Sequence, residues 1–102
     1  MMESLHRLAA RLDRAAATVA AISYAVPGAD PPHPAFGADA NGRAGELGRA
    51  LHRQWRQASD ARAREAAEAA ARLAATADAV RAAAGNYADI DELALHRQRR
   101  ET

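Results

Sequence analysis

Seven apolar residues near the N-terminus follow one another in alternating steps of three and four, and this spacing is the strongest constraint on the fold. They are Leu5, Leu8, Leu12, Ala15, Val19, Ile22 and Val26. Such spacing is typical of the packed face of a helix in a coiled coil or helix bundle. We therefore predict a helix over residues 4–25. In it, Ser4 caps the first turn, and the hairpin seam consists of Leu5, Leu8, Leu12, Val19 and Ile22.

A proline-rich segment follows and ends the first helix at Pro27-Gly28. Four prolines remove backbone donors and restrict φ, so the sequence predicts a loop over residues 26–42. Phe36-Gly37 carries the only large apolar side chain of the central loop. Two roles are open for Phe36: a plug that covers one end of the helices, or a contact residue that faces solvent.

A second, much longer helix is predicted over residues 43–96, beginning between Asp39 and Glu46. Its apolar positions run from Leu47 to Tyr87 at helical spacing. Gly42, Gly45 and Gly48 recur every third residue near its start, which we interpret as close backbone packing at the turn. Gly85-Asn86 is a possible break, although the periodicity continues beyond it and favours an uninterrupted helix.

The unequal helix lengths lead to a prediction about partners. The first helix spans roughly 30 Å and the second roughly 60 Å or more, so a short loop leaves much of the second helix uncovered. The predicted fold is a single all-α domain over residues 1–102, an antiparallel helix-turn-helix hairpin that pairs into a four-helix bundle. The expected partner interface comprises Leu47, Leu51, Trp55, Leu73 and Val80.

Composition argues for packed helices and against a reaction centre. About three residues in ten are Ala, the best helix former and a poor core filler. The chain has no Cys, and its four His occupy no metal-binding spacing. We find no nucleophile or phosphate-binding motif, and we expect no enzyme activity, no catalytic residues, no metal and no cofactor.

Charge and hydropathy narrow the expected partners to proteins. The net charge is +1, and the short basic run from Arg97 to Arg100 gives no electrostatic footprint for nucleic acid. No stretch reaches transmembrane length, so no stable membrane insertion is expected. Arg7, Arg11 and Arg14 before an Ala-rich run resemble the start of a signal peptide, but Asp13 and the early leucine periodicity argue against cleavage.

Tyr87 and Asp91 form the most distinctive pattern of the second helix. They are four residues apart, so a helix presents the phenol ring and the carboxylate on one face. Such a pair suits recognition by a groove on another protein. The alternative is that Tyr87 packs in the seam and Asp91 is merely solvated.

In length, in its two helices, in Phe36-Gly37 and in Tyr87-X-X-X-Asp91, the chain resembles the small helical-hairpin substrates of actinobacterial type VII (ESX) secretion. These substrates are the Trp-X-Gly superfamily and its EspC-like branch. Residues 5–16 are also similar to the first helix of that branch. The resemblance implies that Tyr87 and Asp91 form the export signal. The Trp-X-Gly turn motif itself is not present: Phe36-Gly37 stands nearest its place, and Trp55 is followed by Arg56.

The resemblance further implies a protein made in the cytoplasm and exported, folded, to the cell surface or beyond without a cleavable signal peptide. Its partners would be a homodimeric or heterodimeric related hairpin and the secretion ATPase or a coupled component. Two alternatives remain open on sequence grounds. One is a dedicated chaperone or targeting subunit for a larger effector or toxin, and the other is an intracellular structural coiled coil.

Overall fold

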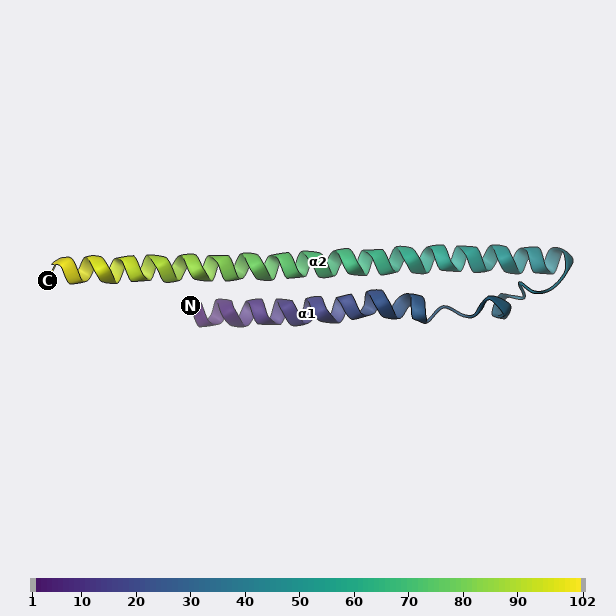
Figure 1. The fold of residues 1–102 in the computed structure, drawn as a ribbon, viewed down its shortest axis with the longest axis horizontal. Coiled ribbons are helices and arrows are strands. Elements are labelled where there is room, and N and C mark those ends of the chain that lie inside the picture. Colours follow the sequence, from purple (N-terminus) through teal and green to yellow (C-terminus); the bar gives the residue numbers. More distant parts are fainter. Residues whose placement is uncertain (1, 102) are drawn as a thin grey trace. The chain divides into compact units, whose positions relative to one another are not determined.

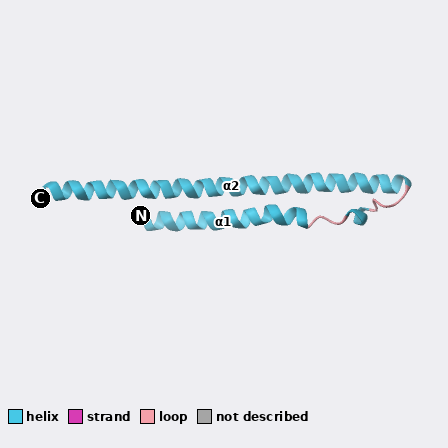
Figure 2. Ribbon diagram, in the orientation of Figure 1, coloured by secondary structure: helices cyan, strands magenta, loops and turns pink. Residues whose placement is uncertain are grey.

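The computed structural model describes residues 2–101. It contains two α-helices, α1 (Met2–Gly28) and α2 (Gly42–Glu101), and a short 3₁₀ helix η1 (His33–Phe36) between them (Figures 1 and 2). No strand occurs among residues 2–101. The predicted all-α helix-turn-helix fold is confirmed.

Both helices extend beyond the predicted bounds. α1 begins at Met2, so Ser4 lies inside its first turn and is not the N-cap residue. At the other end α1 contains Pro27 in its last turn. The amide of Ala29 hydrogen-bonds to the carbonyls of Ala25 and Val26 at 3.1 and 3.2 Å. The missing proline donor therefore interrupts the hydrogen-bond series without ending the helix at that residue.

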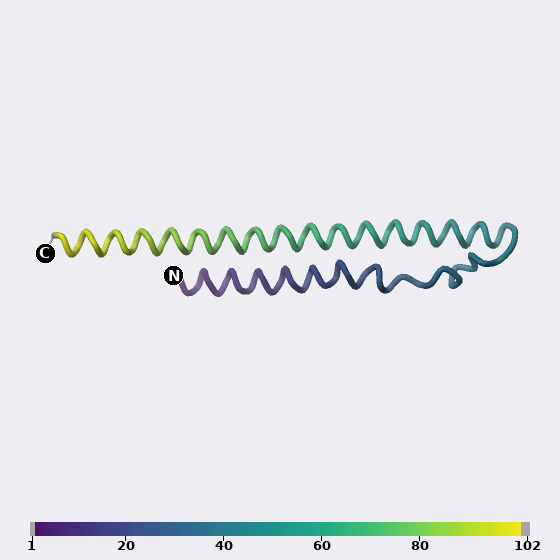
Figure 3. The backbone as a smooth tube through the Cα atoms, in the orientation of Figure 1, coloured from purple at the N-terminus to yellow at the C-terminus, as the bar shows by residue number. Residues whose placement is uncertain are grey.

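α2 is one uninterrupted helix of 60 residues, as the tube in Figure 3 shows. It begins at Gly42, within the predicted interval, and runs through Gly85 without a break to Glu101. A Cβ added at Gly85 would meet no atom within 4 Å, and its backbone is not in the left-handed region. Gly85 therefore only weakens the local helix propensity.

The contacts of the chain group into two compact units. Among the described residues, the first unit combines residues 2–17 of α1 with residues 70–101 of α2, and the second unit comprises residues 18–69. Each unit is described by itself below.

In the first unit, the closest packing is between alanines spaced seven residues apart. The buried residues of this Ala seam are Ala9, Ala16, Ala70, Ala77 and Ala84. Leu5, Leu12, Leu73 and Val80 flank the seam and are half-buried. Since the Ala side chain is small, the two helices can approach closely, with the larger residues beside the contact line rather than in it.

This packing differs from the predicted hairpin seam. Leu8 is 42% exposed and Ile22 is 47% exposed, although the spacing placed both in the packed face. The packed side of α1 is instead formed by Leu5, Leu12 and Val19 together with Ala9 and Ala16. The packed face of α1 is therefore centred nearer to its small side chains than the spacing predicted, because small side chains permit the closer helix contact.

An ion pair aligns the helices of the first unit. Arg81 Nη1 donates to Asp13 Oδ2 at 2.7 Å, and Arg81 Nη2 donates to Asp13 Oδ1 at 3.3 Å and to Asp78 Oδ1 at 3.1 Å. At about 1.5 Å per residue in each antiparallel helix, this contact places the start of α1 close to Glu92. The last turns of α2 therefore continue past the N-terminus of α1, as Figure 1 shows.

Candidate protein-recognition surfaces

The loop of the second unit is held against the first turns of α2. Asp30 accepts a hydrogen bond from Trp55 Nε1 at 2.9 Å through its Oδ1 atom, and Ser59 Oγ donates to the same oxygen. Arg49 Nη1 donates to the carbonyl of Ala38 at 2.9 Å. Ala38 is buried. The loop thus runs along α2 instead of making a short turn at its end.

An aromatic cluster covers the same stretch of α2. Phe36 lies 5.5 Å from His52 and 6.1 Å from Trp55, measured between ring centroids, and His33 stands edge-on to His52 at 4.7 Å. Phe36 is half-buried. Its predicted role as a plug agrees with these contacts, although Phe36 covers the side of α2 rather than the end of the hairpin.

Glycines make the close approach of loop and helix possible. A Cβ added at Gly48 would lie 2.2 Å from the carbonyl oxygen of Phe36, and one added at Gly45 would lie 1.7 Å from the carbonyl oxygen of Ala40. Gly37, which ends η1, has a φ of 72° in the left-handed region that favours glycine. The predicted backbone crowding at the glycine repeat is confirmed for Gly45 and Gly48.

Leu73 and Val80 were predicted to face a partner, and they lie elsewhere. In the first unit, the beginning of α1 pairs with the second half of α2. Leu73 and Val80 are half-buried beside the Ala seam, not in an uncovered overhang. Sequence gave no signal for the Asp30 contacts, which join residues 25 and 29 positions apart.

Three of the five predicted interface residues remain largely uncovered. Leu47, Leu51 and Trp55 are four residues apart and 62, 44 and 48% exposed. We call this line, with Arg43 one step before it, the amino-proximal patch of α2. Arg43 and Arg53 are exposed. An apolar line of this kind is a feature of protein-binding surfaces.

Tyr87 and Asp91 lie in the first unit, on the part of α2 opposite the beginning of α1. Tyr87 is 46% exposed and Asp91 is exposed. Both belong to a continuous helix, so their spacing of four places the ring and the carboxylate on one face. Tyr87 is not enclosed in the seam, unlike Ala84 one turn earlier.

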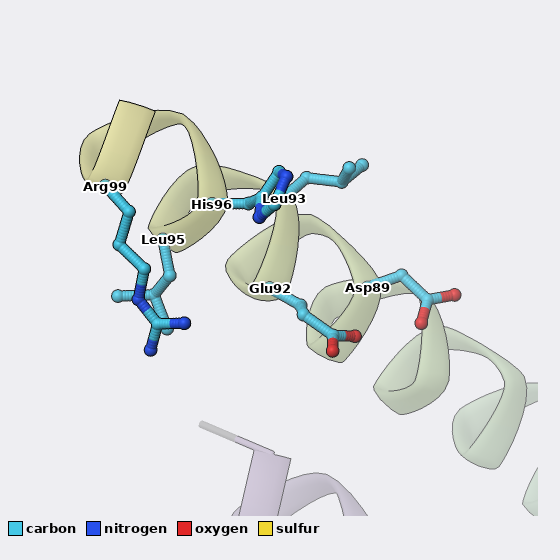
Figure 4. A pocket seen from close by; sticks show the side chains of 6 residues that line it. All are labelled: Asp89, Glu92, Leu93, Leu95, His96 and Arg99. Carbon is cyan, nitrogen blue, oxygen red and sulfur yellow. The ribbon is translucent and has the colours of Figure 1, made fainter. Parts of the chain in front are cut away.

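The final turns of α2 carry three exposed apolar side chains. Ile90, Leu93 and Leu95 are more than half exposed, and they alternate with Asp89, Glu92 and Arg99. Figure 4 shows a shallow hollow at this end, lined by Asp89, Glu92, Leu93, Leu95, His96 and Arg99. All six side chains come from one helix, so no second element closes the hollow around a small ligand.

Within residues 2–101, no cluster of three or more His, Cys, Asp or Glu side chains is arranged to hold a metal ion. No helix in that range combines the length and apolar character needed to cross a bilayer.

Fold and surfaces together define an all-α helical hairpin with an Ala seam and uncovered apolar lines on its long helix. Comparison with protein families, with curated proteins and with solved structures finds no match to this chain.

Proposed function

We propose that this chain is a type VII (ESX) secretion-associated protein, exported as a folded helical dimer, with Tyr87-X-X-X-Asp91 as its export signal. The observation that carries the proposal is the exposure of both side chains on an unbroken helix. A receptor can reach the phenol ring and the carboxylate together without unfolding the hairpin. The secretion ATPase, or a component coupled to it, is the proposed reader.

The turn region supports the same proposal. Trp55 and Phe36-Gly37 are distant in sequence, but the rings of Trp55 and Phe36 lie 6.1 Å apart. The loop and α2 thus bring a tryptophan beside an aromatic-glycine pair, although the sequence contains no Trp-X-Gly motif. Trp55 keeps about half of its surface exposed for contact with another chain.

The test is secretion of point variants from a host with a working type VII system. We expect Tyr87→Ala and Asp91→Ala to abolish export, with helicity and association unchanged by circular dichroism and light scattering. Tyr24→Ala and Asp60→Ala are matched controls, because both residues are exposed and lie outside the pair. Normal export of both Tyr87→Ala and Asp91→Ala would refute the signal.

A second candidate function is that of a dedicated chaperone or targeting partner for a larger secreted effector. The exposed line Leu47, Leu51 and Trp55 favours it, since a client helix could cover that line. Under this alternative, the purified chain aggregates alone and becomes soluble when co-expressed with its client. A soluble homodimer with a cooperative thermal transition would exclude it.

A further inference from the structure

The junction between the loop and α2, in the second unit, is an asparagine-glycine step. Asn41 is exposed and is the last residue before α2, which begins at Gly42. Within residues 2–101, the side chain of Asn41 makes no hydrogen bond. Gly42 has a φ of 69°, in the left-handed region, and a Cβ added to it would meet no atom within 4 Å. The carboxamide of Asn41 is therefore free to turn, and the space beside Gly42 is open.

The backbone amide of Gly42 is not engaged either. It is the first amide of α2, and the first four amides of a helix have no acceptor within the helix itself. In the part of the chain that the structure describes, no hydrogen bond of the loop uses it as a donor. Because glycine has no side chain, nothing on the residue itself shields this nitrogen. An unheld carboxamide and an accessible backbone nitrogen are thus adjacent in the chain.

From these observations we infer that Asn41-Gly42 is a self-modification site, at which the backbone nitrogen of Gly42 attacks Cγ of Asn41. A bond forms between these two atoms and the bond from Cγ to Nδ2 breaks. The proton of the Gly42 amide leaves with the amide group as ammonia, and a cyclic imide remains. Water then opens the ring at one of its two carbonyl carbons. One opening gives an aspartate, and the other gives an isoaspartate, whose main chain passes through the former side chain.

The second asparagine of the chain shows why the site is specific. Asn86 is the only other asparagine, and it lies inside the uninterrupted helix α2. The next amide belongs to Tyr87, where the helical hydrogen-bond series holds it and a ring adjoins it. Ring closure at Asn86 requires that the helix open locally, whereas closure at Asn41 breaks no hydrogen bond.

Formation of isoaspartate frees the end of the loop from α2. It adds one carbon to the main chain beside Ala40, whose carbonyl group lies directly against the helix. A Cβ added at Gly45 would lie 1.7 Å from the carbonyl oxygen of Ala40 and 2.7 Å from its carbonyl carbon. Since the added carbon has no room on the helix side, it displaces the loop outward. The nearby hydrogen bond from Arg49 to the carbonyl of Ala38, at 2.9 Å, is then lost.

Formation of aspartate changes the charge and keeps the main chain. A carboxylate replaces the carboxamide of Asn41 immediately before the first turn of α2. Negative charge near the N-terminus of a helix interacts favourably with the helix dipole. The two products therefore act on the same junction in opposite ways, and only the isoaspartate releases the loop.

The test is incubation of the purified chain in mildly alkaline buffer, followed by tryptic digestion and mass spectrometry. Trypsin separates the two asparagines, since it releases residues 15–43 with Asn41 and residues 82–97 with Asn86. We expect residues 15–43 to gain the mass difference between a carboxamide and a carboxylic acid severalfold faster than residues 82–97. The matched control Asn41→Gln keeps the carboxamide and should abolish the gain, because its longer side chain closes a less favourable ring.

The fluorescence of Trp55 reports the release of the loop separately. Isoaspartate is quantified by methylation with protein isoaspartyl methyltransferase, and the Trp55 emission should shift to longer wavelength in proportion to it. Asn41→Asp stands for the other product and should keep the emission of the unchanged chain. Repair of the isoaspartate by the same methyltransferase should restore the original emission.

Two results would overturn the inference. Equal rates at Asn41 and Asn86, or no reaction in residues 15–43, would show that the junction is not a selective site. A chain rich in isoaspartate with unchanged Trp55 emission would show that the reaction does not release the loop. The reaction requires no secretion system, so either result leaves the proposed function standing.

Discussion

The indole N–H of Trp55 donates to the Asp30 carboxylate at 2.9 Å, and this bond joins the loop just after α1 to the fourth turn of α2. Ser59 donates to the same carboxylate oxygen. This acidic side chain is one of the contacts that hold the proline-rich loop along α2.

Replacing Asp30 with Ala should release the loop from α2. Trp55 and Ser59 both lose their acceptor. The loss of a hydrogen bond to a charged group costs about 1.5–3 kcal/mol of stability when the donor is buried. Because Trp55 is half exposed, we expect a loss at the lower end of that range. Trp55 is the only tryptophan, so its fluorescence should shift to longer wavelength.

Asp39→Ala is the matched control for this variant. Asp39 lies 3.7 Å from His33 and is largely exposed, so its removal should leave the Trp55 emission and the melting temperature almost unchanged. Equal effects of the two substitutions would contradict the assigned role of Asp30.

Two Gly→Ala substitutions on α2 should change the free energy of unfolding in opposite directions. Gly48→Ala places a methyl group 2.2 Å from the Phe36 carbonyl oxygen and should destabilise the fold by more than about 1 kcal/mol. Gly85→Ala meets no atom within 4 Å and should stabilise the helix by about 1 kcal/mol. Urea unfolding followed by circular dichroism measures both. Stabilisation by Gly48→Ala would show that the loop does not lie where the structure places it.

Enlarging the Ala seam should separate the helices of the first unit. Ala77 is completely buried, and Ala77→Leu should reduce the free energy of unfolding by about 1–3 kcal/mol through overpacking. Ala79→Leu is the control, because Ala79 is exposed two residues further along the same helix. If Ala77→Leu is tolerated as well as Ala79→Leu, the close helix contact at the seam is wrong.

The Asp13–Arg81 pair should contribute orientation more than stability. Both side chains are about two-fifths to one-half exposed, and exposed ion pairs contribute roughly 0–1 kcal/mol. A double-mutant cycle with Asp13→Asn and Arg81→Gln should give a coupling energy in that range, decreasing with added salt. A coupling of several kcal/mol, insensitive to salt, would indicate a buried pair instead.

Several features of this protein follow from local sequence. The steps of three and four from Leu5 to Val26 indicated a helix, the prolines from Pro27 to Pro34 indicated a loop, and the continued periodicity through Gly85 favoured an unbroken second helix. The spacing of Gly45 and Gly48 indicated close backbone approach. All of these depend on propensity, sterics and period, which act over a few residues.

The tertiary structure decided which face of each helix is packed and how far the chain travels before it turns back. Leu8 and Ile22 satisfy the same periodicity as Leu12, yet contact between the helices selects Ala9 and Ala16, because small side chains let two backbones approach. Likewise, Asp30 has no local feature that marks it as the acceptor for Trp55. Long-range contacts of Asp30, Ala38 and Phe36 lay the loop along α2. In the first unit, the pairing of the helices leaves Leu73 and Val80 half-buried beside the Ala seam.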